Sequence, residues 1–323
     1  MLVVDVSCKW CGARVKLEEF ESDNVNKGQG FWCPDCDGYT FLNEEKRRFL
    51  VVTESGNGEP LNPDASIKLK KQISPFRYPG GKSKVINTLY SLLREEKLDH
   101  FTEVFAGGAS LGLSLLDAGV IKHLHLNDKD RGVAAFWKVC TEQPQYLINR
   151  LEDESFLPTR ESFFEYKKTL KSTFSDEEEL AWAQLVVNRC AFSGIFMANP
   201  MGDILARWNP DKLISRIKHI HEMSDCIFVS NLDFREFVEE QYWQDKGTLF
   251  VDPPYIEKGI QLYPCSFSEK DHRDLADLLQ MLYVGFPAAD ILVTYDEHPL
   301  VHEIYPLADF KHTGRCYSIA QKS

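Results

Sequence analysis

Short apolar runs alternate with helix-like patterns along most of the chain, and this alternation predicts an α/β fold. Residues 85–94 place Val85, Ile86, Leu89, Leu92 and Leu93 on one face of a helix. Further helices are predicted over 109–118, 131–140, 234–240 and 269–284. Strands are predicted over 102–105, 123–126, 226–229, 248–251 and 291–295, with a last pair near 305–310 and 315–320.

The regular succession of strand and helix predicts a doubly wound, Rossmann-like sheet. Residues 143–224 interrupt this pattern, because they are mostly helical and irregular, and so they are expected to form an insert. Residues 53–66 are rich in turn-forming residues and poor in apolar ones, which is typical of a linker. The expected domains are a small module over 1–50, a linker over 51–72, a sheet domain over 73–142 and 225–323, and an inserted domain over 143–224.

Four of the nine cysteines form two Cys-x-x-Cys pairs, Cys8-Lys-Trp-Cys11 and Cys33-Pro-Asp-Cys36. Their four thiolates can complete a tetrahedral shell around one ion, so the paired spacing predicts a structural zinc ribbon, with iron as the minor alternative. About fifty residues bury little core, so zinc is expected to supply much of the folding free energy of this module. The ribbon is expected either to cap the structure or to bind nucleic acid or a protein partner.

Composition describes an ordinary globular protein, with 43% hydrophobic and 27% charged residues. The sequence has no apolar stretch of about 18 residues and no signal-peptide pattern at its start, so we expect a cytoplasmic protein without a membrane span, monomeric by default. The net charge of −12 argues weakly against a nucleic-acid partner. Most of the excess lies in residues 225–323, however, whereas 73–140 and 181–224 are slightly basic, and a local basic face is enough to bind a polyanion.

Three segments at the carboxyl ends of predicted strands carry candidate chemistry, since open α/β sheets bind ligands there. Ala106-Gly-Gly-Ala-Ser110 lets the backbone approach a ligand closely, although a tight turn explains it equally well. Asp128 follows the second strand, where it can bind a ribose or cap a helix; Asp130 can also act as the cap. In Asp252-Pro-Pro-Tyr255, the two prolines stiffen the turn and fix an acidic side chain beside an aromatic ring. The carboxylate can accept a hydrogen bond from an amine, and the tyrosine ring can stack on a planar heterocycle.

These segments resemble the motifs of a known family. Asp252-Pro-Pro-Tyr255 resembles the catalytic tetrapeptide of amino-methyltransferases that use S-adenosylmethionine (SAM). Phe76-Arg-Tyr-Pro-Gly-Gly-Lys82 and Glu103-Val-Phe-Ala-Gly-Gly-Ala-Ser110 resemble the cofactor motif and the glycine motif of Dam-like DNA adenine-N6 methyltransferases. Asn188-Arg-Cys-Ala-Phe-Ser-Gly194 is similar to a segment that these enzymes share, and the motifs occur in the same order. The resemblance covers roughly residues 73–323.

The resemblance implies a SAM-dependent, site-specific DNA methyltransferase that transfers a methyl group to the N6 amine of a flipped-out adenine. Tyr78 and Lys82 would line the SAM site, with Lys82 near the carboxylate end of the cofactor. The residues that would form the floor of this site are Phe105, Gly107 and Gly108. Asp128 would bind the ribose hydroxyls and Asp233 the adenine of the cofactor.

At the catalytic tetrapeptide, Asp252 would border the cofactor and, together with the carbonyl of Pro253, bind the target amine. Tyr255 would stack on the target base. The insert is the expected target-recognition domain, and its candidate DNA contacts are Arg189, Arg207, Lys212, Arg216 and Lys218. Arg207-Trp-Asn-Pro210 differs from the Dam segment, so a GATC target is not implied, and the zinc ribbon lies outside the family pattern.

Two alternatives to a DNA adenine-N6 methyltransferase stay open at this point. One is the same chemistry on another amine, such as cytosine N4 or adenine in RNA. The other is a zinc-containing nucleic-acid-binding protein with an inactive methyltransferase fold, although Tyr78, Lys82, Asp128 and Asp252 supply the groups that the reaction needs. The sequence is compatible with an enzyme of a restriction–modification system, with a solitary enzyme and with one encoded by a phage.

Overall fold

The computed structural model describes most of the chain. The described residues are 4–7, 12–17, 30–36, 39–41, 48–54, 67–70, 72–77, 85–194, 198–244, 246–256, 267–285 and 288–313. Near the N-terminus lie two antiparallel strand pairs, β1 (Val4–Ser7) with β2 (Arg14–Leu17) and β3 (Gly30–Trp32) with β4 (Tyr39–Phe41).

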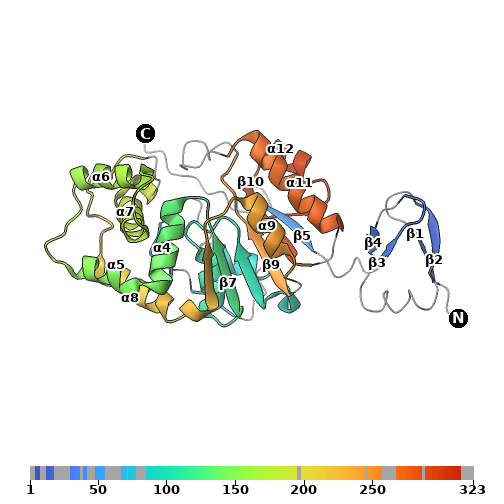
Figure 1. Ribbon diagram of the computed structural model, residues 1–323, viewed down its shortest axis with the longest axis horizontal. Coiled ribbons are helices and arrows are strands. Elements are labelled where there is room, and N and C mark those ends of the chain that lie inside the picture. The colour runs from blue at the N-terminus through green and yellow to red at the C-terminus, as the bar shows by residue number, and fades with distance from the viewer. Residues whose placement is uncertain are drawn as a thin grey trace.

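A parallel sheet of seven strands forms the centre of the fold (Figure 1). Its strands, in the order in which they lie, are β11 (Asp309–His312), β5 (Phe49–Glu54), β10 (Asp290–Asp296), β9 (Gly247–Val251), β6 (His100–Glu103), β7 (His123–Asn127) and β8 (Ile227–Ser230). All six neighbouring pairs are parallel, as helical crossovers between strands require. The predicted doubly wound sheet is therefore confirmed.

The central strands are apolar on both sides because helices cover both faces of the sheet. In β5, Leu50 and Val52 belong to one hydrophobic core, and Phe49 and Val51 belong to the other. The first core contains α2 (Ile86–Tyr90), α3 (Ser110–Asp117) and α4 (Arg131–Glu142). The second contains α9 (Phe234–Tyr242), α11 (Glu269–Gly285) and α12 (Pro299–Ile304).

The predicted insert consists of α5 (Pro144–Glu152), α6 (Arg160–Lys171), α7 (Glu177–Cys190) and α8 (Pro210–His221). The short 3₁₀ segments η4 (Phe192–Gly194) and η5 (Ser224–Cys226) lie before and after α8, and η3 (Glu95–Lys97) lies in the sheet domain. Figure 1 shows the insert helices at one end of the sheet, beside α4. Trp182 and Leu185 of α7 share one continuous core with Phe136 of α4 and with the first face of the sheet. The insert is therefore packed onto the sheet domain and does not have a separate core.

The structure corrects the predicted start of the linker. Residues 51–54 belong to β5, which lies between β10 and β11 in the sheet. Val51 and Val52 are buried, so this strand contributes to both cores. The linker prediction was wrong at these residues because the strand partners of β5 lie more than two hundred residues away in the sequence. In the part of the chain that the structure describes, no helix has the length and apolar character needed to span a membrane.

Candidate active site

The carboxyl ends of β6 and β9 meet at the point where the order of strands reverses. β6, β7 and β8 follow one another toward one edge of the sheet, and the chain then returns to place β9 on the other side of β6. Open α/β sheets bind ligands at such a reversal, outside the carboxyl ends of the strands. Residues 104–108 follow β6 and residues 252–255 follow β9, so two of the predicted motifs come together here.

Asn127 links the ends of three neighbouring strands at this edge. Its buried side-chain amide donates to the carbonyl oxygens of Val104 and Leu232, at 3.1 and 3.2 Å. Its side-chain oxygen accepts from the amide N–H of Leu232, at 2.9 Å. A buried amide with its donors and acceptor satisfied resists rearrangement, because any shift leaves polar groups unpaired. The sequence alone does not reveal this role of Asn127, since its partners come together only in the fold.

The glycine loop turns directly against Asp128. Gly107 has φ 44°, a conformation that glycine adopts without steric cost, and its N–H donates to Asp128 Oδ2 at 2.9 Å. The buried indole N–H of Trp137 donates to the Gly107 carbonyl at 3.0 Å. Gly107 and Gly108 are both buried. The loop is therefore held from two sides, by Asp128 and by a tryptophan of α4.

Asp130, rather than Asp128, caps the following helix. The Asp130 side chain accepts from the backbone N–H groups of Gly132 and Val133 at the start of α4, at 2.8 and 3.3 Å. Asp128 accepts one backbone N–H on each oxygen, from Gly107 at 2.9 Å and from Asp130 at 2.9 Å. A carboxylate oxygen has two acceptor positions, so this leaves one on each oxygen of Asp128 for a ligand.

Burial and the nearby Asp130 carboxylate raise the pKa of Asp128 to about 7. Among the described residues, Asp128 forms no ion pair; the adjacent Lys129 binds Asp233 instead, at 2.7 Å. A pair of hydroxyl donors would stabilise the ionised form of Asp128 without adding charge. The acceptor positions of Asp128 therefore fit the ribose diol of SAM.

The tetrapeptide Asp252-Pro-Pro-Tyr255 lies at the carboxyl end of β9 and is accessible from outside. Asp252, Pro254 and Tyr255 are partly exposed, and Pro253 is buried. Thr294 of the neighbouring strand β10 is fully buried, and its hydroxyl donates to Asp252 Oδ1 at 2.7 Å. The fold thus holds the Asp252 carboxylate through a rigid strand neighbour, a contact that the sequence analysis did not predict.

Comparison with known proteins agrees with this geometry. Residues 78–319 match the family described as D12 class N6 adenine-specific DNA methyltransferase. The chain belongs to this family. It is also similar to the type II methyltransferase M1.LlaDCHI of Lactococcus lactis subsp. cremoris, with 26% identity over 258 residues, 74% of this chain and 86% of that protein. The enzyme is thus an adenine-specific DNA methyltransferase, and the cytosine-N4, RNA and inactive-fold alternatives are set aside.

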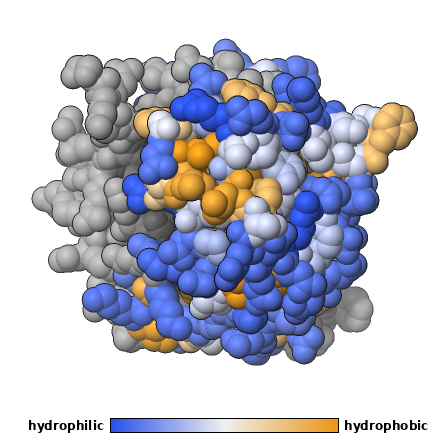
Figure 2. Space-filling model, turned by 90° about the vertical axis from the view of Figure 1, so that its left-hand side faces the viewer, coloured by the Kyte–Doolittle hydropathy of each residue, from blue (hydrophilic) through white to orange (hydrophobic). Residues whose placement is uncertain are grey.

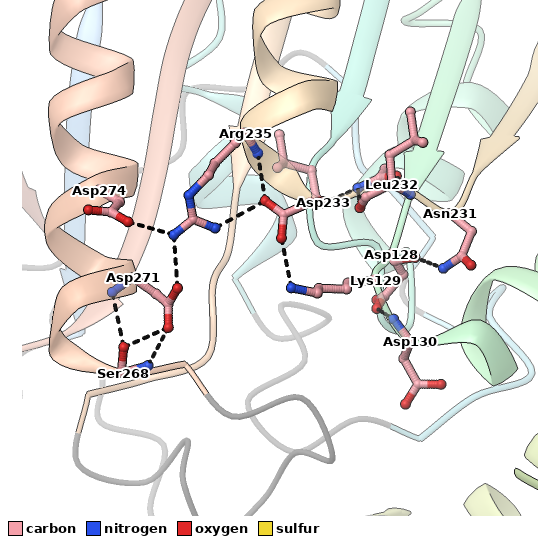
Figure 3. Close-up of polar contacts among 12 residues, drawn as sticks. Asp128, Lys129, Asp130, Asn231, Leu232, Asp233, Arg235, Ser268, Asp271 and Asp274 are labelled. Carbon is pink, nitrogen blue, oxygen red and sulfur yellow. Dashed lines mark hydrogen bonds and ion pairs between the residues drawn. The ribbon is translucent and has the colours of Figure 1, made fainter. Parts of the chain in front are cut away.

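In this D12-class enzyme, Asp233 lies in a chain of ion pairs beside the site (Figure 3). Its carboxylate binds Lys129 at 2.7 Å and Arg235 at 3.1 Å, and it caps α9. Arg235 continues the chain to Asp271 and Asp274 of α11, at 2.9 and 2.7 Å. Burial alone would raise the pKa of Asp233, but its hydrogen bonds to Lys129 and Arg235 and the positive charge of Lys129 lower it below the ordinary value. A contact of Asp233 with the cofactor adenine stays a prediction.

Three aromatic rings from separate elements meet beside the end of β6. Phe105 lies 6.0 Å from Phe234 of α9 and 5.6 Å from Phe267, measured between ring centroids, and Phe234 lies 5.5 Å from Phe267. Phe234 is buried, whereas Phe105 and Phe267 are partly exposed. Of these three rings, only Phe105 was predicted for the cofactor site, because nothing in the local sequence pairs it with Phe234 or Phe267.

Two of the five predicted DNA contacts, Arg189 and Arg216, bind the backbone of residues 74–77, and a third, Arg207, is bound to Arg189. Arg189 donates to the carbonyls of Pro75, at 3.3 Å, and Arg207, at 3.1 Å. Arg216 donates to the carbonyl of Ser74 at 2.9 Å. Burial and the neighbouring guanidinium groups lower the pKa of Arg189 to about 10. The remaining candidates, Lys212 and Lys218, are exposed on α8.

Several predicted residues fall outside the described part of the chain. These are Tyr78 and Lys82 of the cofactor motif and Cys8 and Cys11 of the first cysteine pair. Of the second pair, Cys33 is buried and Cys36 is exposed. The described residues contain no group of three or more side chains placed to hold a metal ion, and with two of the four cysteines outside this set the zinc prediction stays a prediction.

Proposed function

We propose that this methyltransferase binds SAM between the glycine loop and Asp128, and binds a flipped-out adenine at Asp252-Pro-Pro-Tyr255. Tyr78 and Lys82 complete the cofactor site, and Asp128 binds the ribose hydroxyls. The meeting of Gly107, Asp128 and Asp252 at the reversal of strand order is the observation that supports this assignment most directly. SAM, when bound, supplies the methyl group on a sulfonium sulfur.

The residues of the tetrapeptide make the target amine reactive by orienting it. The N6 amine of adenine is a poor nucleophile, because its lone pair is delocalised into the ring. Asp252 and the Pro253 carbonyl accept the two amine hydrogens, which favours a pyramidal nitrogen with a directed lone pair. Catalysis is then mostly positioning and electrostatics. Flipping the base costs a few kcal/mol, which stacking on Tyr255 partly offsets.

The direct test is identification of the product. The protein is incubated with isotopically labelled SAM and either DNA or RNA, and the modified nucleoside is identified by mass spectrometry. We expect label only in N6-methyladenine from DNA. Label in N4-methylcytosine, label in RNA, or unmodified DNA that is nevertheless bound would each overturn the proposal.

The insert is proposed to bind the DNA through a surface that mixes basic and apolar side chains. Figure 2 views the insert end of the molecule and shows a hydrophobic area framed by hydrophilic side chains. Among the described residues of the insert, the exposed large apolar side chains are those of Leu157, Phe164, Phe174, Phe192 and Leu205. Arg207, Lys212 and Lys218 form no ion pair with any described residue, unlike the cations of α11. Unpaired cations are available to phosphates.

Replacing Arg207 and Lys212 together by glutamine is expected to weaken DNA binding and to reduce its salt dependence. Each lost phosphate contact lowers the slope of log K against log salt by about 0.9, so the slope should fall by up to about 2. The matched control replaces Lys270 and Arg273, which are bound to carboxylates on α11. Fluorescence anisotropy at four salt concentrations measures both slopes, and equal slopes in the two double variants would remove this surface from the DNA interface.

The N-terminal module is proposed to be a zinc ribbon. Each Cys-x-x-Cys pair falls between the two strands of an antiparallel pair, residues 8–11 between β1 and β2 and residues 33–36 between β3 and β4. Gly12 has φ 75°, which lets the chain reverse directly after Cys11. The ribbon holds the metal for structure and is available to a protein or nucleic-acid partner.

Purified protein is expected to contain about one zinc ion per chain, bound by four thiolates. Replacing Cys33 by serine should remove most of this zinc and unfold the module, because ligation supplies its folding free energy. Cys226→Ser is the control, since Cys226 is a free thiol beside β8 in the sheet domain. Mass spectrometry for metals measures the content, and full zinc occupancy in Cys33→Ser would contradict the ribbon.

We also infer that the enzyme serves a type II restriction–modification system in the cytoplasm. The relative M1.LlaDCHI is named as a type II methyltransferase, which supports this placement. A partner nuclease should then cut unmethylated DNA at the same site and leave DNA methylated by this enzyme intact.

A further inference from the structure

Three side chains of the insert bind the backbone of the segment that leads into the cofactor motif. Asn188 of α7 accepts from the Arg77 N–H and donates to the Arg77 carbonyl, both at 2.8 Å. Arg189 donates to the Pro75 carbonyl at 3.3 Å, and Arg216 of α8 donates to the Ser74 carbonyl at 2.9 Å. The carbonyls of residues 74, 75 and 77 are thus all held by the insert.

Asn188 and Gly194 are the two residues of the insert that lie directly against the backbone of Arg77. Asn188 is 2% exposed, so the loss of its amide would leave the backbone groups of Arg77 without partners in a buried place. Gly194 has φ 77°, and a Cβ added there would lie 2.1 Å from the Arg77 carbonyl oxygen. Only glycine fits this approach, because 2.1 Å is far below any contact distance that a methyl group tolerates.

The same segment also contacts the glycine loop through α4. The Phe76 ring lies 4.1 Å from that of Phe136 and 5.5 Å from that of Trp137, measured between centroids. Trp137 in turn donates to the Gly107 carbonyl at 3.0 Å. Residues 74–77 therefore lie between the insert and α4, whose Trp137 holds the glycine loop beside Asp128.

We propose that Asn188 and Gly194 are positioning residues of the cofactor site: they fix residues 74–77 and, through the contact of Phe76 with Trp137, the glycine loop that Trp137 holds. The inference rests on the proposed function, because it takes the glycine loop and Asp128 as the site that binds SAM. It gives the insert a second role besides recognition of DNA, since the integrity of the Asn188–Gly194 segment sets the affinity for SAM.

Asn188→Leu is expected to raise the Kd for SAM at least ten-fold, measured by titration calorimetry, with a matching rise in the KM for SAM. kcat at saturating SAM and the Kd for DNA without cofactor should each change less than two-fold, a pattern that general loss of structure would not produce. Gln184→Leu is the matched control. Gln184 is a buried amide one turn earlier on α7, and it makes no hydrogen bond to residues 74–77.

A second pair of variants keeps the test decisive if Asn188→Leu does not fold. Gly194→Ala and Gly119→Ala both place alanine at a positive φ, but the Cβ at Gly119 meets nothing within 4 Å. Both variants carry the strain of a positive φ, and Gly194→Ala adds the clash with the Arg77 carbonyl, so SAM binding is measured at a temperature at which both variants are folded. Only Gly194→Ala should weaken SAM binding ten-fold or more. The inference would be overturned if Asn188→Leu bound SAM as tightly as Gln184→Leu, or if Gly194→Ala bound SAM as tightly as Gly119→Ala.

Tyr78→Ala separates this inference from the proposed function. If Tyr78→Ala weakens SAM binding and both Asn188→Leu and Gly194→Ala leave it unchanged, the positioning role is wrong and the proposed cofactor site stands. If Tyr78→Ala has no effect on SAM binding, the proposed cofactor site itself is wrong.

Discussion

Replacing Asp252 by alanine is expected to lower kcat roughly a thousand-fold or more, while SAM binding largely survives. In the proposed site, the carboxylate is one of two acceptors that orient the target amine, and it acts on charge that develops on the nitrogen as the methyl group transfers. Removing one such preorganised group costs about 10²–10³ in kcat in other enzymes, and here the amine also loses its directed lone pair. Single-turnover kinetics on a DNA substrate measure the chemical step, and calorimetry measures SAM binding.

Variants at Asp252 and Thr294 separate the charge of the carboxylate from its orientation. Asp252→Asn keeps the shape of the side chain but not its charge, and its kcat should lie within about ten-fold of the kcat of Asp252→Ala. Thr294→Val removes the hydroxyl that donates to Asp252 at 2.7 Å, and should lower kcat about ten-fold with an unchanged KM for SAM. Thr294→Ser should restore most of the activity. Turnover like that of the wild type in Asp252→Ala would refute the catalytic assignment.

The elements of the sheet could be predicted from sequence because their signals are local. The run Thr248-Leu-Phe-Val251 is buried on both faces in β9, and the prediction differs from the observed strand by one residue. The strand β5 could not be found in this way. Its sequence adjoins a segment rich in turn formers, and the partners that make it a strand, β10 and β11, lie far along the chain.

The candidate site shows the same limit at the level of single residues. Sequence placed Asp128 and Asp130 together at the end of a strand, and only the structure shows that Asp130 caps α4 while Asp128 keeps acceptor positions for a ligand. Arg189 and Arg216 were predicted from charge alone as DNA contacts. Their guanidinium groups bind backbone carbonyls near Ser74, a role that composition cannot reveal. Thr294 and Asn188 have no sequence motif that points to their partners.

The affinity for SAM is expected to depend on pH through Asp128. Its pKa in the folded protein is about 7, well above the ordinary value, so the carboxyl is largely protonated at pH 6 and ionised at pH 8. Hydroxyl donors bind the ionised form, so binding at low pH requires loss of a proton first. The Kd should therefore rise roughly ten-fold from pH 8 to pH 6. Asp128→Asn should bind SAM roughly a hundred-fold more weakly at pH 8 and show no such pH dependence.

At pH 8, Asp128→Asn should be more stable against unfolding than the wild type, although it binds SAM more weakly. Because the pKa of Asp128 is raised on folding, the unfolded chain ionises this group at lower pH than the folded protein does. Its contribution to stability is therefore lost as the pH rises from about 4 toward 7. Without SAM, Asp128→Asn should have a higher Tm than the wild type at pH 8, and the difference should vanish near pH 4. A lower Tm at pH 8, or a Kd for SAM that is equal at pH 6 and pH 8 in the wild type, would show that Asp128 does not bind the cofactor as an ionised group.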